Sequence, residues 1–280
     1  MPFQLNSLLV KEIVRQALLE DIGKGDITTD TLFKEHDTGK SCLLAKAGGI
    51  IAGLDVARLV FETLDQGIMW EEKCKDGQQV GPGTILAYIT GSVRTILTGE
   101  RVALNFLQRM SGIATRTAAY VKLVEKYPVR IIDTRKTTPG LRLLEKYAVR
   151  VGGGGNHRLD LHSAVMIKDN HIKAAGSITN ACKILRASIP VTTSIEVEAE
   201  TIEQVKEALE NNVDIIMLDN MPLEMMRQAV RLIDKKALVE ASGGISMENV
   251  VEVARTGVDL ISIGQLTHSV QVLDISLNLE

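Results

Sequence analysis

Strand-like and helix-like segments alternate along the chain from about residue 112 onward. Six short segments rich in Val, Ile and Leu recur with helix-like segments between most of them: VRIIDT, AVMIKDN, SIEVE, IIMLDN, VEASGG and LISIG. Continuous apolar runs of this length are typical of parallel strands buried on both faces. Repeated βα units of about 23 residues predict an α/β fold, either a βα barrel or a doubly wound sheet. Polar residues at the strand ends favour the barrel, and no GxGxxG motif follows a strand to indicate a dinucleotide-binding sheet.

The first 112 residues lack this alternation and mix helices with strands. Spacing and turn residues predict helices over residues 8–19, 54–64 and 93–110 and strands over residues 41–46, 69–74 and 84–90. The segment GKGDITTD reads as a loop. We therefore predict three parts: an N-terminal α+β domain over residues 1–112, a βα-barrel catalytic domain over residues 113–268, and a C-terminal tail over residues 269–280 that packs back on the N-terminal domain.

Helix starts inside the barrel region follow from local chemistry. Thr138 is a favoured N-cap and Pro139 a good first helical residue, so they predict a helix that begins at Pro139. A further helix is predicted to begin at about Ile178.

Composition excludes several classes of partner. The net charge is −3 and aromatic residues make up only 3%, so neither a basic nucleic-acid surface nor a base-stacking platform is indicated. No run of eighteen apolar residues could span a membrane, and the amphipathic start is not typical of a signal peptide. The chain has an odd number of cysteines, Cys42, Cys74 and Cys182, and no CxxC motif. This pattern indicates reduced thiols in a cytoplasmic protein.

Basic residues are concentrated between residues 133 and 173. This stretch holds eight Lys or Arg against four acids, a local excess of +4, together with three of the five histidines and a run of four glycines. Arg135, Lys136, Arg158 and Lys168 are among these cations, and some of the others lie on a predicted helix surface. Arginine binds carboxylates and phosphates through a planar fork, and glycine lets the backbone approach a ligand closely. The stretch therefore predicts a pocket for a small, multiply anionic molecule.

Other polar residues end the predicted strands and would meet at the mouth of a barrel. Glu198 and Asp219 suit a divalent metal, ribose hydroxyls or a developing positive charge, and they could at the same time balance Lys168 and Arg158. The loops ASGGI and SIGQ follow the last two strands, where such barrels commonly offer backbone N–H groups to a phosphate.

Two other chemistries receive less support from the sequence. The spacings of His157, His162 and His171 match no zinc motif, so a single substrate-contacting histidine, His157 beside Arg158, is the favoured interpretation. Lys136 or Lys168 could form a Schiff base, but the neighbouring glycines and acids fit a polyanion better.

Taken together, the motifs resemble those of the quinolinate phosphoribosyltransferase family. The matching segments run in order over nearly the whole chain: LLEDIGKGDITT, GERVALNFLQRMSGIAT, DTRKTTPGLRLLEKYAVRVGGGGNHRLDLHSAVMIKDNHI, IEVE, IIMLDN, EASGGI and SIGQLTHS. The resemblance implies an N-terminal α+β sandwich domain and an open βα barrel of about seven parallel strands. It also implies transfer of phosphoribosyl from phosphoribosyl pyrophosphate to quinolinate with loss of CO₂, dependence on Mg²⁺, and a place in NAD biosynthesis.

The resemblance also implies a role for individual residues. Quinolinate would be surrounded by Arg135, Lys136, His157, Arg158 and Lys168, and by Arg101 contributed across the interface of a homodimer or a larger homo-oligomer. Glu198 and Asp219 would face the ribose and a Mg²⁺ ion held mainly through the substrate, and with Lys136 and Lys168 they form the expected catalytic set. The 5′-phosphate would be received by Ser242, Gly243, Gly244, Gly264 and Gln265.

Three alternatives stay open at this point. A paralogue of the same fold could prefer another acceptor, although the complete TRK, NHR and IKDNH segments argue against it. A non-catalytic sensor of a phosphorylated pyridine would not need Glu198 and Asp219, and both are present. A Schiff-base lyase is the third alternative, and borohydride trapping would reveal it.

Overall fold

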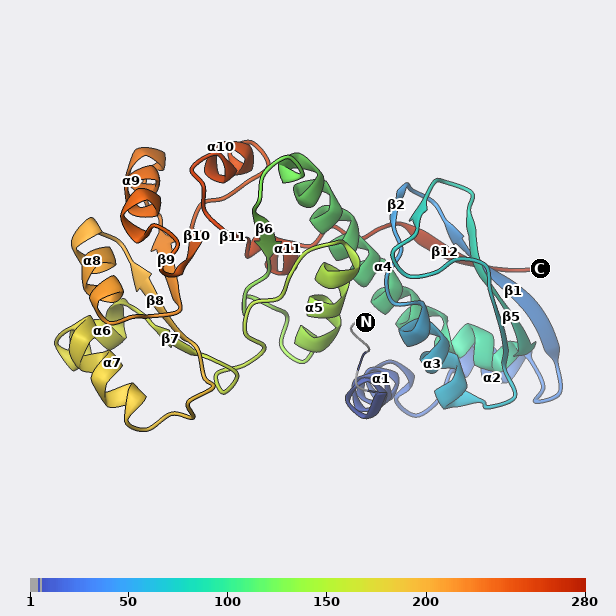
Figure 1. The fold of residues 1–280 in the computed structure, drawn as a ribbon. Coiled ribbons are helices and arrows are strands. Elements are labelled where there is room, and N and C mark those ends of the chain that lie inside the picture. Colours follow the sequence, from blue (N-terminus) through green and yellow to red (C-terminus); the bar gives the residue numbers. More distant parts are fainter. Residues whose placement is uncertain (1–4, 6) are drawn as a thin grey trace. The chain divides into compact units, whose positions relative to one another are not determined.

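A computed structural model of the protein describes Leu5 and residues 7–280. The chain forms two compact units (Figure 1). The first takes the described residues up to Ala118 together with residues 137–153 and 266–280, and the second takes residues 119–136 and 154–265. The domain boundaries expected at residues 112 and 268 stay predictions. No helix of the described residues is long and apolar enough to cross a membrane.

The first unit contains a four-stranded antiparallel sheet. Its strand order is β12 (Ile275–Leu279), β1 (Thr38–Ala45), β5 (Ile85–Ser92) and β3 (Met69–Glu72). Ser41 lies opposite Leu279, so the end of the chain completes a sheet that begins near its start. A separate pair is formed by β2 (Gly49–Ile50) and β4 (Gln79–Val80).

Helices α1 (Ser7–Ile22) and α3 (Leu54–Leu64) of this unit lie where the sequence predicts them. The segment GKGDITTD was wrongly expected to be a loop throughout, since α2 (Ile27–Leu32) begins in it. The Asp26 carboxylate accepts a hydrogen bond from the Thr29 N–H at 3.0 Å and so caps this short helix.

Helix α4 (Val93–Val124) extends well beyond the end predicted at residue 110. The sequence after Met110 shows no break, but its small residues gave no clear apolar stripe. Beyond Met110 the helix lies close to another segment, because a Cβ at Gly112 would lie 2.9 Å from the Cα of Val272, so only glycine allows that close approach.

The helix predicted to begin at Pro139 begins instead at Arg142, as α5 (Arg142–Val151). Gly140 has a φ of +81°, which interrupts a right-handed helix at that point. The Thr138 hydroxyl accepts a hydrogen bond from Nη2 of Arg109 at 2.6 Å, while the Thr138 carbonyl accepts the Leu141 N–H in a turn. The polar groups expected to cap the helix are therefore engaged elsewhere.

The second unit is built on a six-stranded parallel sheet, and all six strands coincide with the segments predicted from the sequence. Their order in the sheet is β6 (Arg130–Ile132), β11 (Leu260–Ser262), β10 (Leu238–Ser242), β9 (Ile215–Asp219), β8 (Ile195–Ala199) and β7 (Val165–Ile167). The family resemblance implied about seven strands. In place of a seventh strand, Gly155 forms one parallel bridge to Ile132 on the outer side of β6.

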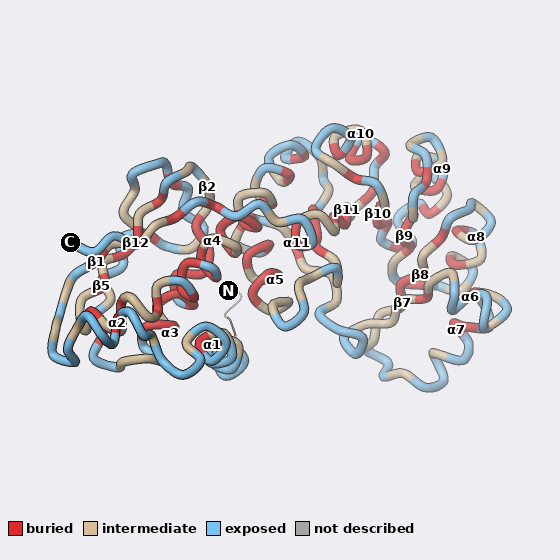
Figure 2. Tube along the Cα trace, turned by 180° about the vertical axis from the view of Figure 1, so that it is seen from behind, coloured by how far each residue is buried: buried red, intermediate tan, exposed pale blue. Residues whose placement is uncertain are grey.

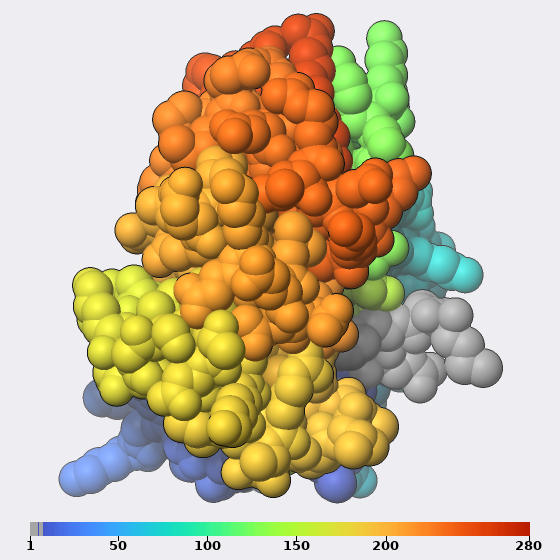
Figure 3. Space-filling model, turned by 60° about the vertical axis from the view of Figure 1, so that its left-hand side comes forward, coloured from blue at the N-terminus to red at the C-terminus, as the bar shows by residue number. Residues whose placement is uncertain are grey.

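Helices cover the outside of this sheet. They are α6 (Asp169–Ala175), α7 (Ile178–Arg186), α8 (Ile202–Glu210), α9 (Leu223–Ile233) and α10 (Val250–Ala254), and α11 (Gln265–His268) follows β11. Central strand residues such as Val197, Ile216 and Ala241 are fully buried, and Figure 2 shows the buried colour along the strands. In Figure 3 the yellow and orange segments that carry α7, α8 and α9 lie next to one another in chain order. The strands thus form an α/β core with its carboxyl ends left for a site.

Candidate active site

A cavity of about 580 Å³ lies in the second unit, at the carboxyl ends of the parallel strands. Its wall brings together ten of the thirteen predicted site residues. The lining is formed by Thr134, Arg135, Lys136, His157, Arg158, Met166, Lys168, Glu198, Met217, Asp219, Asn220, Glu240, Ser242, Gly243, Gly244 and Ser262. Most of the residues predicted to bind an anionic molecule therefore line one cavity within one unit.

Strand alternation explains why these side chains meet. In a β-strand, residues two apart point to the same face, so each strand offers one residue at its end and one a layer deeper. The pairs along the strands are Met166 and Lys168, Glu196 and Glu198, Met217 and Asp219, and Glu240 and Ser242. The parallel register sets Ser242 beside Asp219 and Glu198 beside Met217. Within each pair the residue nearer the strand end was predicted from the sequence, and the residue two positions before it was not.

One side of the cavity is cationic. Nη1 of Arg158 donates to the Ala164 carbonyl at 2.9 Å, which fixes the guanidinium. Burial lowers the pKa of Arg158 from its ordinary value, and the neighbouring Arg135 lowers it further. Lys168 pairs with Glu198, with 2.6 Å between Nζ and Oε2, while Lys136 is exposed. Cations held this close together favour a ligand that carries more than one negative charge.

Asp133 anchors the loop that carries His157 and Arg158. Its carboxylate is fully buried and accepts hydrogen bonds from Nδ2 of Asn156 at 2.6 Å and from the His157 N–H at 2.9 Å. Gly155 bonds the backbone of β6 in the same loop, with its N–H donating to the Ile131 carbonyl at 2.8 Å. These bonds hold the cationic side of the pocket against the sheet.

The opposite side of the cavity is formed by tight turns after β9 and β10. Gly243 and Gly244 have φ values of +91° and +59°, and Asn220 has a φ of +52°. The Asn220 N–H donates to the Ser242 carbonyl at 2.9 Å, and its Nδ2 donates to Oδ2 of Asp219 at 2.8 Å. A Cβ at Gly243 would lie 2.5 Å from Cγ of Asn220, so the turn needs glycine there. Turns of this kind expose backbone N–H groups that suit an anion.

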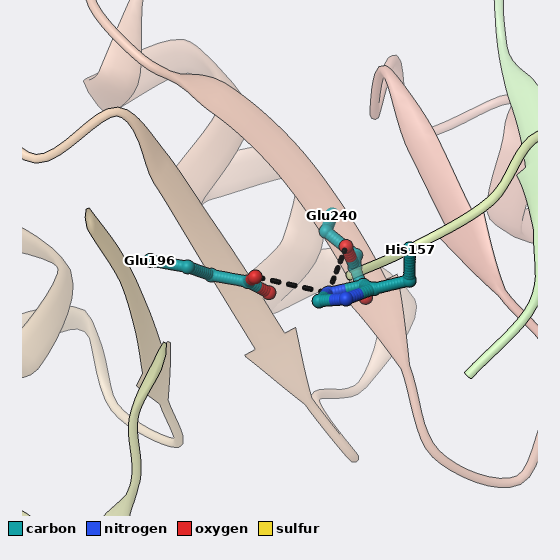
Figure 4. A group of neighbouring side chains, drawn as sticks. All are labelled: His157, Glu196 and Glu240. Atoms are coloured by element: carbon teal, nitrogen blue, oxygen red, sulfur yellow. Dashed lines mark ion pairs between the residues drawn. The ribbon is translucent and has the colours of Figure 1, made fainter. Parts of the chain in front are cut away.

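A buried cluster of three titratable side chains forms the deep part of the pocket. Nε2 of His157 lies 2.9 Å from Oε2 of Glu196 and 3.6 Å from Oε2 of Glu240 (Figure 4). Their side chains are 8%, 3% and 0% exposed. Burial raises the pKa of Glu240 to about 7, with a further contribution from the nearby Glu196 carboxylate.

The remaining predicted site residues lie outside the cavity wall. Gly264 and Gln265 follow β11 and are half-buried, and neither lines the pocket. Arg101 is exposed on α4, in the first unit. His162 and His171 are exposed, and His171 accepts the Lys168 N–H at 2.9 Å at the start of α6.

Sequence reasoning missed Glu196, Asn220 and Glu240. The signal for the two glutamates was present, because each stands two residues before a predicted site residue on the same strand face. Asn220 gave no such signal, since its importance depends on where the neighbouring strand places Gly243.

Comparison with known proteins agrees with this geometry. The family described as quinolinate phosphoribosyl transferase, N-terminal domain, matches residues 26–111, and the corresponding C-terminal domain matches residues 113–278. The chain is 46% identical over 275 residues to a probable nicotinate-nucleotide pyrophosphorylase [carboxylating] of Synechocystis, with 97% of this chain and 93% of the relative covered. A protein of the same description from Bacillus subtilis is 45% identical, with 98% and 94% covered.

A solved structure supports the same relationship. The crystal structure of NadC from Streptococcus pyogenes shares 44% identity with the chain and superimposes with a TM-score of 0.95 over 99% of each chain. The relationship thus extends through both matched domains as well as through the pocket-bearing sheet. The chain belongs to the quinolinate phosphoribosyl transferase family.

Proposed function

We propose that the protein transfers phosphoribosyl from phosphoribosyl pyrophosphate to quinolinate and releases CO₂, pyrophosphate and nicotinate mononucleotide. The observation that carries the proposal is the single cavity with two chemically different sides. Cations from the segments after β6 and β7 line it together with carboxylates and glycine turns at the ends of β8, β9 and β10. The relatives named nicotinate-nucleotide pyrophosphorylase [carboxylating] support the same reaction, which belongs to NAD biosynthesis.

The cationic side fits the two carboxylates of quinolinate. Arg158 and Arg135 supply planar guanidinium groups that bind carboxylates through two parallel hydrogen bonds. Lys136 and Lys168 add point charges, and the His157 ring closes the pocket next to them. The family resemblance implies that a second subunit contributes Arg101 to this set, so the proposal includes a homo-oligomer with a shared site.

The opposite side fits the phosphoribosyl group. Ser242, Gly243 and Gly244 end β10 in a turn that suits the 5′-phosphate, and Gly264 and Gln265 follow the adjacent strand. Glu198 and Asp219 end the neighbouring strands β8 and β9 and face the same cavity. Their hard carboxylate oxygens fit a Mg²⁺ ion bound mainly through the substrate's phosphates. Bound there, Mg²⁺ would offset charge on the pyrophosphate leaving group.

The reaction asks the protein chiefly to position and neutralise its substrates. Departure of pyrophosphate builds positive charge on the ribose ring, which the Glu198 and Asp219 carboxylates stabilise electrostatically. The pyridine nitrogen, held by the cationic side, attacks the anomeric carbon and becomes cationic. The adjacent carboxylate then leaves as CO₂, since the positive nitrogen stabilises the electron pair that remains on the ring. No covalent bond to the protein is needed.

The proposal also covers the location of the protein and its choice of acceptor. Cys42, Cys74 and Cys182 are free thiols, and this supports a cytoplasmic location. A paralogue with another acceptor is the nearest competing function, but the pairing of Arg135 with Arg158 in one pocket favours a substrate with two carboxylates.

Release of radiolabelled CO₂ from carboxyl-labelled quinolinate tests the proposal. Purified protein should release the label only when phosphoribosyl pyrophosphate and Mg²⁺ are both present. Protein that binds phosphoribosyl pyrophosphate but releases no label would contradict quinolinate as the acceptor, and other pyridine acids would then be screened.

A further inference from the structure

Glu196 and Glu240 form a buried cluster with His157, and these two glutamates have no part in the function proposed above. All three side chains are nearly or fully buried, and His157 and Glu240 line the cavity. Glu240 is also two residues before Ser242 on β10, so it lies one layer deeper than the proposed phosphate turn, on the same strand face. Buried titratable groups in contact with a substrate pocket are candidates for proton transfer.

Hydrogen bonding assigns the protonation state of His157. The backbone N–H of Arg158 donates to Nδ1 of the imidazole at 2.7 Å, so Nδ1 carries a lone pair rather than a proton. The ring proton is therefore on Nε2, which lies 2.9 Å from Oε2 of Glu196. The imidazole is neutral in this arrangement.

The same bond argues against a metal ion in the cluster. The three side chains offer ligand atoms within 4.8 Å of one another, which is compatible in distance with a cation. A histidine that ligates through Nε2 needs a lone pair there and normally donates its Nδ1 proton to an acceptor. Here Nδ1 faces a donor, so the cluster holds a proton in preference to a metal.

Charge balance places a proton on Glu240. A neutral imidazole cannot compensate two buried carboxylates, and two like charges this close do not both ionise. Oε2 of Glu196 lies 2.9 Å from Nε2 of His157, whereas Oε2 of Glu240 lies 3.6 Å away, so the Nε2–H stabilises the charge of Glu196 more than that of Glu240. The charged groups that act on Glu240 are Glu196 from β8, His157, and Lys168 beyond β7. Glu240 is therefore the neutral acid of the cluster.

We propose that Glu240 donates the proton that replaces CO₂ on the pyridine ring. This inference rests on the function proposed above. When the bond between the ring carbon and the carboxylate breaks, its electron pair stays on the ring carbon and CO₂ departs. In the same step that electron pair takes the proton of the Glu240 carboxyl group and forms the C–H bond of the product, so the loss of CO₂ depends on the proton donor. Glu240 is left as a carboxylate and regains a proton from water after the product leaves.

Glu240 suits this role better than the lysines of the pocket, which are its other possible proton donors. Lys168 is engaged by Glu198 at 2.6 Å, and Lys136 is exposed. A neutral carboxylic acid in the deep part of the pocket also avoids repelling an anionic substrate, which a carboxylate would do. Burial of the group thus serves both substrate binding and proton donation.

Glu240→Gln separates the two halves of the reaction. Glutamine keeps the shape and neutrality of the protonated acid but has no acidic proton to give. We expect pyrophosphate release to continue while CO₂ release slows about 100-fold, in line with the usual contribution of a general acid. The mononucleotide of quinolinate should accumulate. Both products are measured in the same single-turnover reaction, after quinolinate binding by the folded variant has been verified by calorimetry.

Glu240→Asp serves as the matched variant, because it retains an acidic group at a shorter reach and should recover part of the CO₂ release. Equal, unslowed release of CO₂ and pyrophosphate by Glu240→Gln would overturn the proposal and leave water or Lys168 as the donor. A wild-type protein that releases neither product would instead contradict the proposed function.

The wild-type protein provides a second test if Glu240→Gln does not fold. Because the pKa of Glu240 is about 7, the donating form is lost as the pH rises above that value. The ratio of CO₂ to pyrophosphate in a single turnover should therefore fall below one in alkaline solution. A ratio that stays at one over the whole alkaline range would refute Glu240 as the donor.

Discussion

Gly243→Ala is expected to weaken binding of phosphoribosyl pyrophosphate through a neighbouring side chain. A Cβ at this position would lie 2.5 Å from Cγ of Asn220 and closer still to its Oδ1. Asn220 must then move, and it loses the hydrogen bond from Nδ2 to Oδ2 of Asp219, now 2.8 Å long. Asp219 is one of the two carboxylates proposed to face the ribose, so the disturbance reaches the substrate.

Two separate effects set the size of the expected changes in stability and in binding. Alanine in the left-handed region costs about 1–2 kcal/mol of stability, because the φ of Gly243 is +91°. A lost hydrogen bond to a charged group is worth about 1.5–3 kcal/mol. If that second loss appears in binding, the Kd for phosphoribosyl pyrophosphate rises about 10- to 100-fold. Titration calorimetry with Mg²⁺ present measures the Kd, and thermal unfolding measures the stability lost through backbone strain.

Two variants separate strain from displacement of Asn220. Gly176→Ala introduces the same kind of strain, with a φ of +88°, at a helix end where nothing lies within 4 Å of the new Cβ. It should lower the Tm without changing the Kd. Adding Asn220→Gly to Gly243→Ala makes room for the Cβ and should restore part of the binding that the steric contact removes. An unchanged Kd in Gly243→Ala itself would refute the reasoning.

Other perturbations test the remaining parts of the site. Arg158→Ala should weaken quinolinate binding strongly and Arg158→Lys nearly as much, since neither retains a bidentate contact; unchanged kinetics would contradict the assignment. Mixing inactive Arg101→Ala and inactive Lys168→Ala chains should restore some activity if subunits share sites, and no rescue after verified subunit exchange would count against sharing. Nicotinate, which lacks one carboxylate, should be a poor substrate because cations stay unpaired, so equal turnover would refute the specificity. In chemical unfolding, the free energy of unfolding of the wild type should fall as the pH rises from 4.5 to about 7, because folded Glu240 keeps a proton that the unfolded chain has released. Glu240→Gln should flatten this dependence of stability on pH. An identical dependence in the variant would contradict a buried proton at Glu240.

Local sequence patterns were sufficient to predict an element or a strand-end residue wherever one interaction dominates. The six parallel strands coincide with the predicted apolar segments, because a strand buried on both faces leaves a clear composition signal. Residues at strand ends, such as Lys168 and Glu198, were likewise identified, since the carboxyl ends of parallel strands meet at one edge.

Local patterns were insufficient where segments distant in the sequence compete for the same group. Thr138 is a good N-cap by type, but Arg109 takes its hydroxyl and α5 begins later. Helix α4 continues past its predicted end and comes close to residue 272 at Gly112. Neither contact can be seen in a window of neighbouring residues.

The sequence by itself determined the strands, the cationic loop and the family motifs, because each of these depends on residue type and short spacing. Only the tertiary structure decided the state of the deep layer, where His157, Glu196 and Glu240 come from three different segments. Their protonation depends on burial and on distances of 2.9 Å and 3.6 Å across the sheet, and those quantities exist only once the chain has folded.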